Sequence, residues 1–214
     1  MGRGPVGEPA IIKYVNNSLA SVDDVSNTDG AMILIKTLTA SSSANLSFVN
    51  GTSDVVLDST YPIYKFVWTN IHPGTDDKNF QVNFRDGGSS YDATKTSTSF
   101  GADHTEAGSG QMDYITGIDQ ANGTSFQNIC SDGDIKTDND SSLSGTLHLF
   151  NPSSTTFVKH FIATTNHMVN NSQSSNNYIG GYFNTTSAID EIQFKFDSGD
   201  IDAGTIKLYG IKDS

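Results

Sequence analysis

Cysteine is almost absent from this sequence, and its scarcity excludes several classes of protein. The 214 residues contain a single cysteine, Cys130. One cysteine cannot form an internal disulfide or a cysteine-based metal cluster, so packing and strand pairing must supply the stability. Cys130 has no nearby base in the sequence, and we expect a small buried apolar residue without a redox role.

Long hydrophobic runs are also missing. The first residues, MGRGPVGEPAIIKYVNN, include one arginine but no apolar run of seven residues, as a secretory signal would require. No stretch is long and apolar enough to span a membrane. We therefore expect a protein made in the cytoplasm without a signal peptide and without membrane insertion. If it acts outside a cell, it leaves by lysis, by a dedicated secretion system or within an assembled particle.

Basic side chains are few. The chain has 12 Lys and Arg against 24 Asp and Glu, which gives a net charge of -12. A field of this sign repels phosphate backbones and anionic membranes, so nucleic acid is not expected as a partner. The acidity has two interpretations, which are solubility in a salty medium and the binding of cations.

Helical periodicity is lacking, because no window keeps apolar residues at three-and-four spacing for three turns. Short apolar clusters separated by Gly, Asn, Ser and Pro are instead typical of a β-sandwich or jelly roll. The sequence predicts an all-β protein, with one antiparallel jelly-roll or β-sandwich domain of about ten strands over 31–214. The strands are expected at 32–38, 45–49, 63–71, 80–84, 91–100, 113–118, 144–150, 157–163, 178–184, 190–196 and 204–211.

Alternating side chains predict which faces of these strands are buried. Segment 63–71 places three aromatic residues on one face, Tyr64, Phe66 and Trp68. Segment 80–84 places its apolar residues inward and Asn83 outward.

Turn residues between neighbouring segments predict two pairings. The glycines after Arg85 favour a tight turn that would pair 80–84 with 91–100 as a hairpin. The short linker after 190–196 would pair that segment with 204–211 in the same way.

Residues 1–30 differ from the rest, with prolines and glycines at the start and a polar run from Ser18 to Gly30. We expect an N-terminal arm that is frayed in isolation or orders on a partner. The small apolar patch of this arm would be the part that docks, and it consists of Ile11, Ile12, Tyr14 and Val15.

Catalytic motifs are missing as well. The sequence has no Gly-rich phosphate loop, no HExxH and no Gly-x-Ser-x-Gly elbow. The histidines are scattered, and the carboxylate pairs Asp23-Asp24 and Asp76-Asp77 lie in loops, where water keeps their pKa values alike. The sequence therefore predicts a protein that is not an enzyme and needs no organic cofactor.

One acidic loop is a candidate cation site. Calcium takes six to eight oxygen ligands, and Asp132, Asp134, Asp138 and Asp140 could supply several of them. The spacing does not fit the EF-hand template, because Lys136 occupies a ligand position and no distal Glu follows. A bound Ca²⁺ and a plain solvated loop are the two alternatives.

Three aromatic residues are candidates for glycan contact. Tyr61, Trp68 and Tyr91 could stack on the C–H face of a sugar. Trp68 is flanked by Phe66 and Val67 within an expected strand, which favours a place in the core for this ring.

Four phrases of the sequence resemble a known group of proteins: LIKTLTASSSANLSFVNG, YKFVWTNIHPGTDDKNFQVNFRDGGSSYDATKT, FNPSSTTFVKHF and GYFNTTSAIDEIQFKFDSGDIDAGTIKLYGIK. They are similar to virion structural proteins of tailed bacteriophages, particularly marine ones, of the tail-fibre, head-fibre and decoration-like kinds. The resemblance covers about 34–214. It marks surface β-sandwiches of the particle better than any one location on it.

The resemblance implies a structural protein at the virion surface. No coiled coil, collagen-like repeat or β-helix shaft precedes the domain, which favours a head decoration or cement protein, or a short fibre tip, over a long tail fibre. Its partners would be capsid or tail proteins bound through the arm, and further copies of the chain in a homo-oligomer, with a trimer expected. The alternative is a lectin-like module that binds carbohydrate receptors on the host surface.

Overall fold

The computed structural model describes residues 12–15, 18–22, 31–131, 135–169 and 172–213. The chain divides into two compact units, Met1–Ala31 and Met32–Ser214. In the first unit, β1 (Ile12–Val15) and β2 (Ser18–Val22) pair antiparallel. The arm expected from the sequence therefore contains a β-hairpin that the sequence analysis did not predict.

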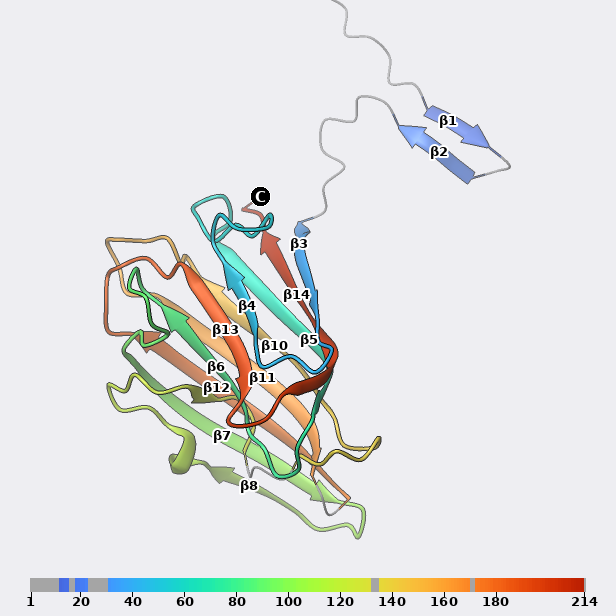
Figure 1. The fold of residues 1–214 in the computed structure, drawn as a ribbon, viewed down its shortest axis with the longest axis vertical. Coiled ribbons are helices and arrows are strands. Elements are labelled where there is room, and N and C mark those ends of the chain that lie inside the picture. The colour runs from blue at the N-terminus through green and yellow to red at the C-terminus, as the bar shows by residue number, and fades with distance from the viewer. Residues whose placement is uncertain (1–11, 16–17, 23–30, 132–134, 170–171, 214) are drawn as a thin grey trace, which may run out of the picture. The chain divides into compact units, whose positions relative to one another are not determined.

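The second unit is a β-sandwich of two antiparallel sheets (Figure 1). The large sheet has eight strands in the order β3-β14-β5-β10-β11-β12-β7-β8, and the small sheet has four in the order β4-β13-β6-β9. This confirms the all-β prediction, while the jelly-roll form stays a prediction.

Most strands overlap the predicted segments. The strand predicted at 113–118 is found at Gly110–Tyr114, and the strand Gln127–Asn128 was not predicted. The large sheet contains β3 (Met32–Thr39), β14 (Ile201–Ile211), β5 (Ile63–Pro73), β10 (Leu143–Phe150), β11 (His160–Val169), β12 (Gln173–Phe183), β7 (Lys95–Thr105) and β8 (Gly110–Tyr114). The small sheet contains β4 (Leu46–Val49), β13 (Glu191–Phe196), β6 (Phe80–Arg85) and β9 (Gln127–Asn128). The one described helix is the 3₁₀ turn η1 (Thr116–Ile118), and no helix of the described ranges could cross a membrane.

An aromatic cluster fills the space between the sheets. Phe194 of the small sheet packs against Trp68 of the large sheet, with ring centroids 5.9 Å apart, and against Phe66 at 5.7 Å. Tyr64, Phe66 and Trp68 are all buried, whereas the residues between them are only partly so. The predicted alternation of this strand is confirmed, and its aromatic face is the core face.

Both predicted pairings are wrong. Strand β6 pairs with β13 and β9, while β7 pairs with β12 and β8 in the other sheet. Likewise β13 belongs to the small sheet and β14 to the large one. For β13 and β14 the physical reason is that each strand carries an apolar face, and these faces bury more area when they meet across the sandwich than when the strands lie side by side in one sheet. Strand β7 differs, because its buried side chains Lys95, Ser97 and Ser99 are polar.

Asn83 is also a correction, because it is fully buried rather than outward-facing in water. The segment that crosses from β6 to β7 covers it. The Asn83 amide nitrogen donates to the carbonyl oxygens of Tyr91 and Thr124, and Lys95 Nζ donates to Asn83 Oδ1 at 2.7 Å.

Candidate functional site

The candidate binding surface is the outward side of the large sheet. Side chains directly opposite each other on paired strands share a face, so the strand registers define three rows across the sheet. The first is Leu34, Tyr209, Lys65, His148, Ile162, Gly180 and Thr98; the second is Met32, Ile211, Ile63, Phe150, His160, Tyr182 and Thr96; the third is Thr37, Lys207, Val67, Thr146, Thr164, Tyr178, Phe100 and Tyr114. We call these rows, with Ala102 and Met112 beside them, the outer face.

Exposed apolar side chains concentrate on the outer face. Of the ten large hydrophobic residues that are exposed in the described part of the chain, eight lie there: Met32, Leu34, Phe100, Met112, Tyr114, Ile162, Tyr178 and Tyr182. Six of them lie on the neighbouring strands β11, β12, β7 and β8, and contiguous apolar patches on a protein surface mark interaction sites. The other two, Phe157 and Val158, precede β11.

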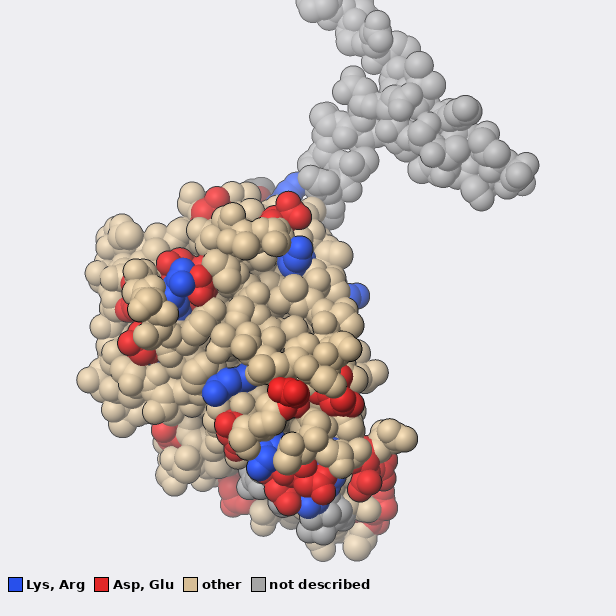
Figure 2. All heavy atoms as spheres, viewed as in Figure 1, with Lys and Arg blue, Asp and Glu red and all other residues tan. Residues whose placement is uncertain are grey.

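The charge of the outer face is opposite to that of the chain. The three rows contain Lys65 and Lys207 but no Asp or Glu. Burial, and next the nearby Lys65 charge, hold the pKa of His148 below its ordinary value, so its imidazole is mainly neutral at neutral pH. One carboxylate, that of Asp119, accepts a hydrogen bond from the Tyr114 hydroxyl at the β8 edge of this face. Figure 2 shows several groups of acidic residues on the side of the sandwich where β4, β13 and β6 lie.

A groove in the outer face runs over Gly180. It has a volume of about 260 Å³ and is lined almost wholly by carbon, from Thr98, Phe100, Ile162, Tyr178, Ile179 and Gly180. Phe100 and Tyr178 stack along one side, with ring centroids 4.9 Å apart and planes 12° apart. A Cβ added at Gly180 would meet no atom within 4 Å, so the glycine forms an open floor.

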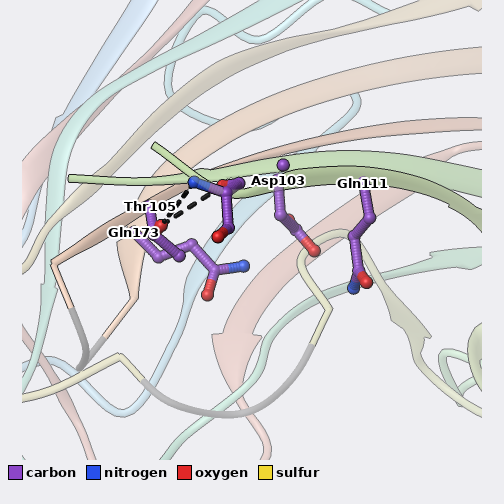
Figure 3. A pocket seen from close by; sticks show the side chains of 6 residues that line it. Asp103, Thr105, Gln111 and Gln173 are labelled. Carbon is purple, nitrogen blue, oxygen red and sulfur yellow. Dashed lines mark hydrogen bonds between the residues drawn. The ribbon is translucent and has the colours of Figure 1, made fainter. Parts of the chain in front are cut away.

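A second, polar groove lies at the β7–β8 hairpin (Figure 3). Asp103, Gln111 and Gln173 line it, and Thr105 Oγ1 accepts a hydrogen bond from the Ser109 amide at 3.1 Å. Asp103 is the sole carboxylate among its lining residues. General acid–base catalysis by a carboxylate pair needs two groups with separated pKa values, and this groove contains one group.

The acidic loop is only partly described. Asp132 and Asp134 lie outside the described residues, and Asp138 and Asp140 are exposed. Within the described part of the chain, no three His, Cys, Asp or Glu side chains are grouped as a metal site would need. The calcium site therefore stays a prediction.

The paired carboxylates Asp76 and Asp77 fasten this loop to the body of the sandwich. Asp76 Oδ1 accepts hydrogen bonds from Thr137 N and Oγ1, both at 2.8 Å, and these bonds hold the pKa of Asp76 below its ordinary value. Asp77 forms an ion pair with Lys136. The lysine that departs from the EF-hand template thus contributes to the attachment of the loop.

The three aromatic candidates for glycan contact are not brought together. Trp68 is 1% exposed and lies in the core, as the core interpretation of this ring expected. Tyr61 packs edge-on against Tyr64, while Tyr91 lies in the segment between β6 and β7, where burial raises the pKa of its hydroxyl. No ring contact joins the three in the described ranges.

The apolar patch predicted to dock the arm belongs to the first unit. Ile11 lies outside the described residues, and Ile12, Tyr14 and Val15 belong to β1 with undescribed side chains. Their docking role stays a prediction.

The outer face was not predicted from the sequence, because side-chain alternation assigns the two faces of one strand but does not tell which strands lie side by side. A signal was present at 178–182, where Tyr178 and Tyr182 flank Gly180 at alternate positions while Ile179 points inward. Apolar residues on both faces of one strand indicate that both faces are covered. The buried cations Lys95 and Lys159 were also missed, since lysine is seldom buried.

No family model, no curated protein and no solved structure matches this chain.

Proposed function

We propose that this chain is a non-enzymatic structural protein at the surface of a bacteriophage particle, as a head decoration or cement protein or as a short fibre tip. The observation that carries the proposal is the outer face. A broad surface with eight exposed large hydrophobic side chains suits binding by shape, whereas catalysis needs a concave site with convergent reactive groups.

The phrases that resemble virion proteins support this function through what their residues do in the fold. Lys159, in the phrase at 150–161, donates to the carbonyl oxygens of Ser154, Thr185 and Ser187, of which the last two lie in the phrase at 181–212. Lys95 and Asn83 bond to each other within the phrase at 64–96. These contacts stabilise loops between strands, so the phrases describe a scaffold and not a reactive site.

The decisive experiment uses purified particles of the phage that encodes the chain. We expect mass spectrometry of intact, gradient-purified virions to detect peptides from 32–214 at many copies per particle. Cryo-electron microscopy of the same particles would then assign the density to head or tail. Virions that lack the chain would refute the proposal.

The carbohydrate-binding alternative stays a prediction, with less support. The burial of Trp68 removes the largest of the three aromatic faces considered for sugar stacking. A glycan array probed with the full chain tests this alternative. Tyr61→Ala is the informative variant, because Tyr61 is only partly buried.

A further inference from the structure

We propose that the outer face is the surface through which copies of this chain bind one another. The inference rests on the proposed structural function and names the partner of that face. Eight exposed large hydrophobic side chains gather there. Burying them removes apolar area from water, which is the main source of free energy in most protein association.

The size of the outer face fits a protein partner. It extends across eight strands, which at about 4.8 Å per strand spacing is roughly 34 Å from first to last. With three rows about 7 Å apart, its area is on the order of 700 Å². A standard protein interface buries about 800 Å² on each partner, so one copy of the face is large enough for a specific contact.

The charges of the outer face favour a second copy of the chain. Two molecules with a net charge of -12 repel each other, and the repulsion at contact is smallest where neither surface presents carboxylates. The three rows have none. Lys207 is exposed on β14, next to the edge strand β3, whereas Lys65 is partly buried in the middle row. The long aliphatic stems of both lysines can lie on apolar surface while their ammonium groups stay hydrated.

The groove over Gly180 favours protein over sugar as the occupant. Sugar and other small-ligand sites place several polar groups to fix the ligand, and this groove is lined almost wholly by carbon. It suits an apolar side chain of the facing copy, as do the pockets that receive anchor residues at protein interfaces. Sheets packed face to face lie about 10 Å apart, close enough for side chains to interdigitate.

The test is sedimentation equilibrium of the full chain from about 1 to 100 µM, a range that detects contacts of micromolar affinity. We expect the measured molar mass to correspond to two or more chains. Ile162→Glu introduces a carboxylate at an exposed position beside the groove, and we expect it to weaken association by about tenfold or more. Phe157→Glu is the matched control, because Phe157 is also exposed and apolar but lies off the outer face.

Circular dichroism of each variant checks that the fold is kept. Ile162→Thr, which retains a β-branched side chain, replaces Ile162→Glu if that variant unfolds. A monomeric wild-type chain would overturn the proposal, as would an oligomer that Phe157→Glu disrupts as strongly as Ile162→Glu. A monomer found at many copies in purified virions would overturn this inference alone and leave the proposed function standing.

Discussion

Lys95 is a cation held in the interior of the sandwich. Its side chain is fully buried, and its ammonium group donates to Asn83 Oδ1 at 2.7 Å and to the Ala93 carbonyl at 3.4 Å. Burial lowers the pKa of Lys95 from 10.5 to about 8, because the charged form loses hydration that two neutral acceptors do not replace. Asn83 in turn orders the segments that contain Tyr91 and Thr124. The buried pair Lys95–Asn83 therefore connects β6 and β7 with the segments that contain Tyr91 and Thr124.

The lowered pKa of Lys95 predicts a pH dependence of stability. Between pH 8 and 10.5 the unfolded chain keeps a proton on this lysine that the folded chain releases, so this group makes the fold more stable as pH rises through that window. The contribution is on the order of 3 kcal/mol. Urea unfolding of wild type and Lys95→Met at pH 7.5 and 10 measures it, and we expect the wild-type minus variant difference to rise with pH.

A Lys95→Met variant whose stability follows that of wild type across this window would contradict the prediction, because burial of the charge would then not govern the titration of Lys95.

Strands show how far the sequence could predict this fold. Alternation is a local property, so the inward face of β5 and most strand positions were predicted correctly. Pairing is not local: β13 lies beside β6 and β4, although β14 follows it directly in the chain. The outer face joins residues from eight strands, and no spacing along the sequence places Leu34 and Ile162 in the same row of the sheet.

The β10 strand depends on one glycine for its position against the core. A Cβ added at Gly145 would lie 2.2 Å from the Thr164 carbonyl oxygen and 2.8 Å from Trp68 Cζ2. Gly145→Ala should therefore lower the free energy of unfolding by about 1–3 kcal/mol, because the backbone of the neighbouring strand must shift. Gly180→Ala has open space and should be neutral or stabilising by up to about 1 kcal/mol. Urea unfolding compares the two, and equal effects would contradict this explanation.

One buried lysine, Lys159, connects the loop before β11 with the loop after β12. Lys159 is buried, and its ammonium group donates to the carbonyl oxygens of Ser154, Thr185 and Ser187. Removing the group would leave these three acceptors without it, so Lys159→Met should cost about 2–4 kcal/mol of unfolding free energy.

Urea unfolding at pH 7 measures the loss at Lys159, and an unchanged dependence on urea concentration would show that the folded state keeps its compactness. Lys195→Met is the comparison, because Lys195 makes one cation–π contact with Phe126 at 4.5 Å and should cost less than about 1 kcal/mol. A smaller loss at Lys159 than at Lys195 would contradict the assigned role.

The protein combines a strong net charge with three described rows of the outer face that contain no Asp or Glu. At low ionic strength the net charge of -12 on each copy opposes association, whereas the apolar contacts of the outer face favour it. Salt weakens the charge repulsion between copies, since the screening length falls from about 10 Å at 0.1 M to about 3 Å at 1 M. The contribution of the apolar contacts does not depend on charge.

Association through the outer face should therefore become several-fold tighter between 0.1 M and 1 M NaCl, measured as the sedimentation equilibrium constant of the full chain. Ion pairs between copies would give the opposite result, so dissociation by salt would show that acidic side chains, and not the apolar rows of the large sheet, hold the copies together.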